Sequence, residues 1–384
     1  MKMGKPFAPP TRRRALAASL LMATPWLHAA PAPLAGVLQH HASLVHASYA
    51  DTLQAARAMQ AAIAAFLAAP DAARHKAAQQ AWLAARDLYG QTEAFRFYGG
   101  PIDAQNGPEG RLNAWPMDES YVDASPAKGG LVQNAKFAIT KPNLARMNER
   151  GGEENIATGW HAIEFFLWGP DTRADAPGQR AVADFVDAPF AARRRDYLRV
   201  VTELLIDDLA SLERAWAPGR ANYRARFENT GREGLRRMLV GIGSLSRGEL
   251  AGERLEVALN TKNQEDEHSC FSDNTHRDAW SNQRGIVNVW RGEYRRADGT
   301  LLQGPSPAAL LAAQDAALAE RLDGALAQSL QLAESLPPPF DQAILSETGR
   351  AHIRRLIDSL LLQSQLIGEA APKLGIQQLK LVEP

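Results

Sequence analysis

Cysteine is almost missing from the 384-residue chain, which contains only Cys270. One cysteine excludes an intramolecular disulfide, and it excludes zinc or iron–sulfur sites built from several thiolates. An excess of charge of one sign is also missing, because 43 Lys and Arg residues balance 43 Asp and Glu residues. Without a global positive field, nucleic-acid binding is not expected as the main activity.

Signals for β-structure are equally scarce. Period-two runs of β-branched residues are nearly missing, and the one Asn-Gly pair, Asn106-Gly107, precedes a proline rather than a strand-like segment. Apolar residues instead recur every three or four positions, as on one face of a helix. The clearest such stripe consists of Val45, Tyr49, Leu53, Ala56, Met59, Ile63 and Phe66. The sequence therefore predicts an all-α fold of packed helical bundles.

The N-terminal segment, residues 1–30, has the composition of a bacterial export signal. It carries five basic residues and no acidic one, then an apolar stretch from Ala15 to Leu27 and the small pair Ala29-Ala30. The apolar stretch is shorter than the roughly 20 residues that a membrane-spanning helix needs. We expect a periplasmic protein whose mature chain has no transmembrane segment. Export by the general secretion route is favoured, and the three arginines 12–14 leave the twin-arginine route as the alternative.

Two helical bundles are expected after this segment. Gly, Pro and Asp cluster in residues 171–189, between two long helical patterns. The predicted division is an N-terminal bundle of residues 31–170, a linker of residues 171–189 and a C-terminal bundle of residues 190–384.

The segment 158–169 carries the strongest chemical signal. His161 and Glu164 are three residues apart, so a helix would place them on one face, surrounded by large apolar residues. A buried carboxylate needs a cation or several hydrogen bonds. The pair therefore fits a metal site, but it also fits a hydrogen bond between the two residues or to an arginine of another helix. Gly159 would allow a neighbouring backbone to approach closely.

The pattern Gly159-x-His161-x-x-Glu164 resembles the signature of the imelysin family, iron-regulated bacterial envelope proteins that are also classed as metallopeptidases. Four further segments are similar to members of this family: residues 90–98, 107–116, 243–254 and 264–275. The resemblance implies two packed helical bundles with a cleft between them, and the signature helix facing that cleft. It also implies a role in iron acquisition and a metal site at His161 and Glu164.

Whether the protein is an enzyme stays open from the sequence. A hydrolytic zinc site commonly needs three protein ligands and a general base, and the signature supplies two ligands and no base. Phe165 stands where an inverted zinc-peptidase motif needs a histidine. A distant histidine could complete the site, with His268 and His276 as candidates.

Other residues are weaker candidates. Glu93 is either a third ligand or the partner of Arg96. The segment 266–276 is either a second source of ligands or a polar lid; its carboxylates and imidazoles suit iron, zinc or manganese better than copper(I). The candidate metal ligands from this segment are Asp266, His268, Asp273 and His276, and the candidate ligand-binding residues are Arg96, Arg111, Trp115 and Gly159.

Three functions are compatible with these patterns. The first is binding of a metal ion, with iron favoured and zinc possible, or of an iron chelate, through His161 and Glu164 in the inter-domain cleft, in concert with an envelope iron-uptake partner. Haem would additionally need an axial histidine and an apolar slot. The second is a zinc-type metallopeptidase that uses the same pair. The third is a structural or adaptor protein without metal.

Overall fold

Helices dominate the part of the chain that the structure describes, namely residue 1 and residues 33–124, 129–173 and 175–383. In this computed structural model the only described strands are two of three residues each. The all-α prediction is therefore confirmed. The expected export signal lies outside the described residues, apart from Met1.

The elements follow one another in this order: α1 (Leu34–Ala68), α2 (Ala72–Thr92), η1 (Glu93–Phe95), α3 (Glu109–Asn113), α4 (Glu119–Asp123), α5 (Lys141–Met147), α6 (Gly159–Trp168), η2 (Val182–Phe185), α7 (Ala191–Trp216), α8 (Tyr223–Phe227), α9 (Arg232–Ser244), η3 (Leu245–Glu256), α10 (Val257–Thr261), η4 (Gln264–Asp266), α11 (Thr275–Arg291), β1 (Glu293–Arg295), β2 (Leu301–Gln303), α12 (Pro307–Ala312), α13 (Ala316–Glu334), α14 (Phe340–Leu345) and α15 (Glu347–Lys373).

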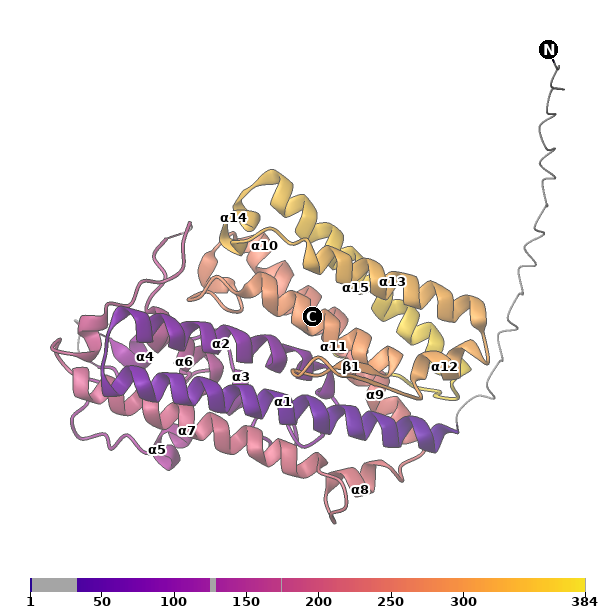
Figure 1. Cartoon of the computed structure of the whole chain (residues 1–384), viewed down its shortest axis with the longest axis horizontal. Coiled ribbons are helices and arrows are strands. Elements are labelled where there is room, and N and C mark those ends of the chain that lie inside the picture. The colour runs from indigo at the N-terminus through magenta and orange to yellow at the C-terminus, as the bar shows by residue number, and fades with distance from the viewer. Residues whose placement is uncertain (2–32, 125–128, 174, 384) are drawn as a thin grey trace. The chain divides into compact units, whose positions relative to one another are not determined.

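Helices α1, α2, α6 and α7 form one packed group (Figure 1). Helix α1 lies along α2 and α7, and α6 packs against α2 and α7. The apolar stripe predicted on residues 45–66 is buried along its whole length. Each such large side chain contributes roughly 1.5–3 kcal/mol when it leaves water. The turn between α1 and α2 is set by Asp71, whose carboxylate accepts a hydrogen bond from the Arg74 amide at 2.7 Å and caps α2.

Helices α9, α11, α13 and α15 form a second group together with η3 (Figure 1). Helix α15 packs against α13, α9 and η3, and α11 packs against α13. Segment η3 is a π-helix, a form of helix that is often found at functional sites. A smaller apolar core lies in this group and includes Leu250, Leu255, Leu259, Phe340, Ile344, Ile353, Leu356 and Leu360.

The two groups meet where α2 packs against α11. Two glycines allow these helices to touch. A Cβ atom on Gly285 would lie 2.3 Å from the carbonyl oxygen of Gln91, and a Cβ atom on Gly90 would lie 2.6 Å from the Cβ of Ser281. Real Cβ atoms do not approach so closely, so this helix crossing requires glycine at both positions.

The predicted division at residues 171–189 stays a prediction. Helix α7, which begins directly after the expected linker, packs against α1 and α6 of the first group. Residues 31–384 form one unit by their contacts.

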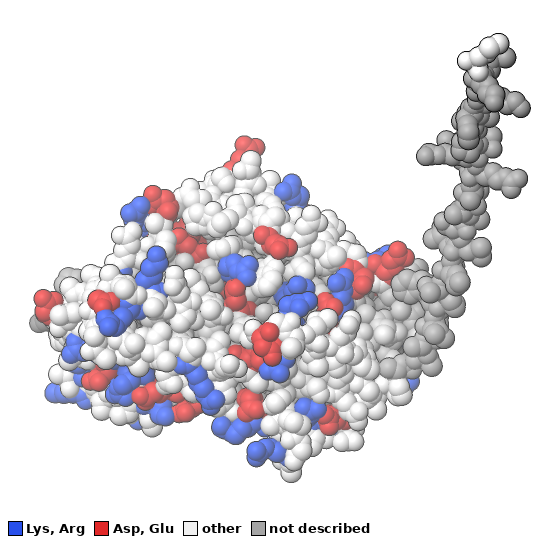
Figure 2. Space-filling view, in the orientation of Figure 1, with Lys and Arg blue, Asp and Glu red and all other residues white. Residues whose placement is uncertain are grey.

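Strands β1 and β2 pair in antiparallel register, with Glu293 opposite Gln303. None of the helices in the described ranges combines the length and the apolar character that crossing a membrane requires. On the face shown in Figure 2, acidic and basic side chains of the described residues are interspersed.

The glycine contact between α2 and α11 gives a first prediction. We expect Gly285→Ala to lower the free energy of unfolding by about 1–3 kcal/mol, because the added methyl group must push against the Gln91 backbone. Urea denaturation followed by circular dichroism measures the change. The matched control is Gly324→Ala in α13, where an added Cβ meets no atom within 4 Å. In that control the free energy of unfolding should instead rise by about 0.5–1 kcal/mol. Equal losses in the two variants would contradict the close crossing.

Candidate functional site

The helix that carries the His-x-x-Glu motif, α6, is fixed at its first residue. Gly159 has φ +85°, and a Cβ atom there would lie 2.4 Å from the carbonyl oxygen of Leu112. The Thr158 hydroxyl donates to the carbonyl of Arg111 at 3.0 Å, and the side chain of Asn148 accepts from the Thr158 amide at 3.1 Å. A neighbouring backbone thus does approach Gly159 closely, and it holds α6 in position against α3.

His161 and Glu164 face each other within α6. Glu164 Oε2 lies 2.9 Å from His161 Nδ1, and the two side chains are 0–1% exposed. The other carboxylate oxygen, Oε1, accepts from the amide and the hydroxyl of Ser272, at 3.0 and 2.6 Å. Burial raises the pKa of Glu164 to about 8, against the opposing effects of Ser272 and of the nearby charge on Arg86. Both oxygens of this carboxyl group are therefore engaged.

A second histidine lies against the first. The ring centroids of His161 and His268 are 4.9 Å apart in an edge-to-face arrangement. His268 Nδ1 is 2.7 Å from Asp278 Oδ2 on α11, and the same oxygen accepts from the Ser269 hydroxyl at 2.6 Å. Residues from α6, from the segment before α11 and from α11 itself thus meet at one buried point, which we call the histidine centre: His161, Glu164, His268, Asp278 and Arg86.

Arg86 of α2 places a positive charge between the two imidazoles. Its Nη2 lies 3.4 Å from His161 Nε2 and 3.3 Å from His268, while its Nε and Nη2 donate to the two oxygens of Asp278 at 3.0 and 3.2 Å. Nη1 donates to the side chain of Asn113 at 2.5 Å. The guanidinium is 1% exposed and all of these partners are buried.

The electrostatics of the centre keep both histidines neutral. Burial, and then the charge of Arg86, lower the pKa of His161 well below its usual range. Burial, and then the charge of Arg254, lower the pKa of His268 to about 4. For Asp278, burial alone would raise the pKa, but Arg86 and His268 outweigh it and hold the pKa far below its usual range. The result is an ionised carboxylate beside two neutral imidazoles.

An ion network adjoins the centre through Asn113. The Asn113 amide is 3.4 Å from Glu93 Oε2, which also accepts from Arg96 at 2.6 Å and from Arg254 of η3 at 2.7 Å. Burial alone would raise the pKa of Glu93, but the charges of Arg96 and Arg254 lower it to about 2. Glu249 of η3 accepts from Arg254 at 2.7 Å. Glu93 is thus paired with Arg96, which is one of the two roles that the sequence allowed for it. It has no direct contact with His161 among the described hydrogen bonds and ion pairs.

A pocket of about 280 Å³ opens next to these groups. Trp115 stands in its wall, with its ring edge-to-face against His268 at 5.7 Å between centroids. The pocket wall is rich in carboxylates and consists of Arg96, Glu109, Asn113, Ala114, Trp115, Glu149, Glu153, Glu249 and His268. His161 is not part of this wall, but His268, whose ring contacts that of His161, is.

The remaining predicted residues lie outside the histidine centre. Arg111 forms a two-point ion pair with Asp208 of α7, at 2.7 and 3.1 Å. His276 has its Nδ1 3.1 Å from the carbonyl oxygen of Asp273. The Asp273 carboxylate lies close to those of two other aspartates instead of the histidines. Asp266 is half-buried in η4.

Sequence reasoning missed four buried residues of this region: Arg86, Asn113, Arg254 and Asp278. A signal for Arg86 does exist, because it lies four residues after Trp82 and three before Tyr89 on the buried stripe of α2. A charged residue on an apolar stripe must have a buried partner. Its partner Asp278 is 192 residues away, however, and only the fold shows that the two meet.

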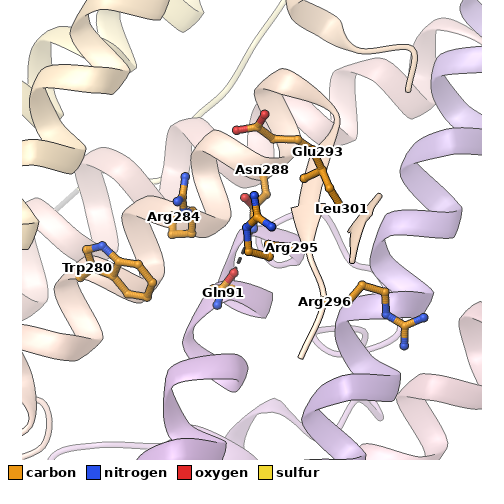
Figure 3. A pocket seen from close by; sticks show the side chains of 8 residues that line it. All are labelled: Gln91, Trp280, Arg284, Asn288, Glu293, Arg295, Arg296 and Leu301. Atoms are coloured by element: carbon orange, nitrogen blue, oxygen red, sulfur yellow. Dashed lines mark hydrogen bonds between the residues drawn. The ribbon is translucent and has the colours of Figure 1, made fainter. Parts of the chain in front are cut away.

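A second pocket, of about 300 Å³, lies at the outer part of the α2–α11 contact (Figure 3). Arg284 and Arg295 contribute to its wall with Trp280, and Asn288 is hydrogen-bonded to Gln91 at 3.0 Å. It shares no residue with the histidine centre.

The histidine centre supplies the donor types of a transition-metal site, although among the described residues only Asp171, Asp273 and Asp341 bring three such donor atoms within 4.8 Å of one another. Neutral imidazole and carboxylate are the donors that iron(II) and zinc commonly take in proteins. His161 Nε2 lies 3.4 Å from Nη2 of Arg86, a positively charged donor. Arg86 therefore interacts with both imidazoles as a cation, and a metal ion bound there would compete with it for the same space.

Comparisons with known proteins agree with the fold. A sequence model of the imelysin family (peptidase M75) matches residues 45–367. Iron-regulated protein A of Synechococcus elongatus is 27% identical over 318 residues, which are 80% of this chain and 76% of that protein.

Two solved structures share the fold. One, assigned as an iron-regulated protein A precursor of Parabacteroides distasonis, superposes with a TM-score of 0.70 at 17% identity and covers 89% of this chain and 96% of its own. The other, an imelysin-like protein from Psychrobacter arcticum 273-4, has a TM-score of 0.59 at 17% identity. It covers 88% of this chain and 94% of its own. Since the family model spans most of the sequence, the chain belongs to the imelysin family.

Proposed function

We propose that this protein binds a metal ion, with iron favoured over zinc, at the histidine centre and serves iron acquisition in the bacterial envelope. His161 and His268 would each give a neutral imidazole nitrogen. A carboxylate oxygen would come from Glu164 or Asp278, which would exchange one of its present contacts, to Ser272 or to Arg86, for the ion. The iron-regulated names of its relatives support the iron-related role. The observation that carries the proposal is the convergence of two buried, neutral imidazoles from separate segments on one cation, Arg86.

Burial of uncharged imidazoles beside a carboxylate supports binding rather than a purely structural pair. Neutral imidazole is the form that coordinates a metal, and burial keeps both rings in that form.

The contacts of the carboxylates favour binding over peptide hydrolysis. A hydrolytic centre needs a carboxylate with a free oxygen to act as general base. Glu164 has both oxygens engaged by His161 and Ser272, and Asp278 is held by Arg86, His268 and Ser269. The wall of the neighbouring pocket is charged, which suits an ion or a hydrated chelate better than the apolar face of haem.

We also propose that the protein works in the periplasm, on the basis of the export signal expected in residues 1–30. The predicted partner is an iron-uptake component of the envelope that delivers or receives the metal. The acidic pocket beside His268 would be the side from which a cation approaches, because carboxylates raise the local concentration of cations.

Metal content tests the proposal directly. We expect the chain 31–384, purified without chelator and offered iron(II) without oxygen, to retain close to one metal ion per molecule by mass spectrometry. His161→Ala should lose it, since one of two imidazole ligands is gone. The control is His46→Ala, a histidine paired with Glu213 on the surface of α1 and α7, which should retain the metal. A wild-type protein that takes up neither iron nor zinc would reduce His161 and Glu164 to a structural pair.

The competition by Arg86 gives a further prediction. Arg86→Met removes a positive charge from the point where a metal would bind, and we expect at least tenfold tighter binding of zinc or iron(II) in calorimetric titration. Arg86→Lys keeps the charge on a side chain of similar length, so its affinity for the metal should be close to that of wild type. Weaker binding by the Met variant than by the Lys variant would instead make Arg86 a part of the binding site.

A further inference from the structure

A second cluster of buried ionisable groups lies apart from the histidine centre. It contains Asp171 from the loop after α6, Asp273 from the segment before α11 and Asp341 from α14. One oxygen of each carboxylate lies within 4.8 Å of the other two. Glu267 joins them, because its carboxyl group is next to that of Asp341. The four side chains belong to residues that are only 0–7% exposed.

These carboxylates have oxygen atoms with no partner. Oδ2 of Asp171 and Oδ1 of Asp273 are buried and accept no hydrogen bond, and the Asp341 carboxyl group lies within hydrogen-bonding reach of the Glu267 carboxyl group. Among the described residues, no lysine, arginine or histidine forms an ion pair with any of the four, whereas Glu93 of the neighbouring network has two arginines. Burial, and then the charges of Asp341 and Asp171, raise the pKa of Asp273 to about 8. Such a cluster is costly unless a cation compensates it.

The geometry and the chemistry of these oxygens identify the class of cation. Oxygen-only ligand sets suit calcium, magnesium or manganese better than copper or zinc. Calcium binds oxygens at about 2.3–2.6 Å, so two ligands on opposite sides of one ion are roughly 4.6–5.2 Å apart. The three aspartate oxygens lie within 4.8 Å of one another, which is close enough for them to share one ion. Magnesium usually takes one or two carboxylates and keeps its water molecules, so four carboxylates favour calcium.

We propose that Asp171, Glu267, Asp273 and Asp341 form a calcium site that joins α14 and the loop after α6 to the segment 264–275. Two hydrogen bonds to backbone carbonyls already connect the loop after α6 with the segment 264–275. The Gln264 side chain donates to the Asp171 carbonyl at 2.9 Å, and the Gly178 amide donates to the Phe271 carbonyl at 3.0 Å. The ion would compensate the negative charge and hold Asp171 against this segment.

The calcium site and the histidine centre share one segment of the chain, residues 264–275. Segment 264–275 contributes Glu267 and Asp273 to the calcium site, and it contributes His268 and Ser272 to the histidine centre. A calcium ion would therefore hold the segment that supplies the second imidazole. The site does not depend on the proposed iron binding, because none of its four carboxylates contacts His161.

Calcium binding to the chain 31–384 tests this site. After removal of metals with EDTA and of the EDTA by dialysis, we expect one calcium ion per chain in calorimetric titration and a rise in Tm of roughly 3–8 °C in 1 mM CaCl2. Hydrogen exchange in residues 264–275 should slow when calcium is added. No binding and no rise in Tm with wild type would overturn the proposal, and an equal rise in 1 mM MgCl2 would overturn calcium as the occupant.

The variant Asp341→Asn keeps the size of the side chain and removes one charge. It should lose the calcium-dependent rise in Tm, while its Tm without calcium is equal to or above that of wild type, since repulsion in the cluster falls. Asp171→Asn gives a second variant with the same expectation. The control Asp358→Asn changes an exposed carboxylate of α15 and should keep the full calcium response. A rise retained in Asp341→Asn, or lost in Asp358→Asn, would contradict the site.

His161→Ala separates the two metal proposals. It should keep the calcium response and lose the iron, whereas Asp341→Asn should lose the calcium response and keep a ligand set for iron. Loss of the calcium response in His161→Ala would show that the ion binds at the histidines instead.

Discussion

The buried ion pair between Arg86 and Asp278 is the interaction on which the rest of the site depends. Both side chains are almost inaccessible, so neither charge could be tolerated without the other, and removal of one partner of such a pair typically costs about 3–5 kcal/mol. The pair can form only because α2 and α11 touch at Gly90 and Gly285. His268 then takes its orientation from Asp278, and the imidazole of His161 meets a guanidinium that is already fixed.

The two clusters of buried carboxylates, one around Glu93 and one around Asp341, are compensated in different ways. The counter-charges of Glu93 are the side chains of Arg96 and Arg254, which belong to the protein itself. The ionised form of Glu93 is therefore stable in the folded protein. The four carboxylates around Asp341 have no such partner among the described residues. Their compensation must come from protons or from a mobile cation. This difference makes one cluster a permanent part of the fold and the other a site that responds to its surroundings.

The sequence predicts those features that depend on local periodicity. The stripe from Val45 to Phe66, the helix around residues 158–169 and the contact between His161 and Glu164 follow from spacing along one helix. The imelysin relationship was also visible, because motifs are local. Features that depend on long-range packing could not be predicted. The sequence grouped Asp273 with His268 because they are five residues apart, yet the turn at Asp273, with φ +55°, places its carboxylate with Asp171 and Asp341.

The depth of the histidine centre sets a condition on the proposed function. His161 is 1% exposed, so a metal ion can reach it only if a covering element moves. The element between His161 and the acidic pocket is the segment that carries His268, since His268 contributes to both. The same segment contributes Asp273 to the carboxylate cluster, and its Gln264 side chain donates to the carbonyl of Asp171. A cation that tightens those attachments stabilises the closed arrangement of His268, and by linkage the release of that cation favours opening. Under the two proposals, iron binding and calcium binding are therefore coupled through one short segment of the chain.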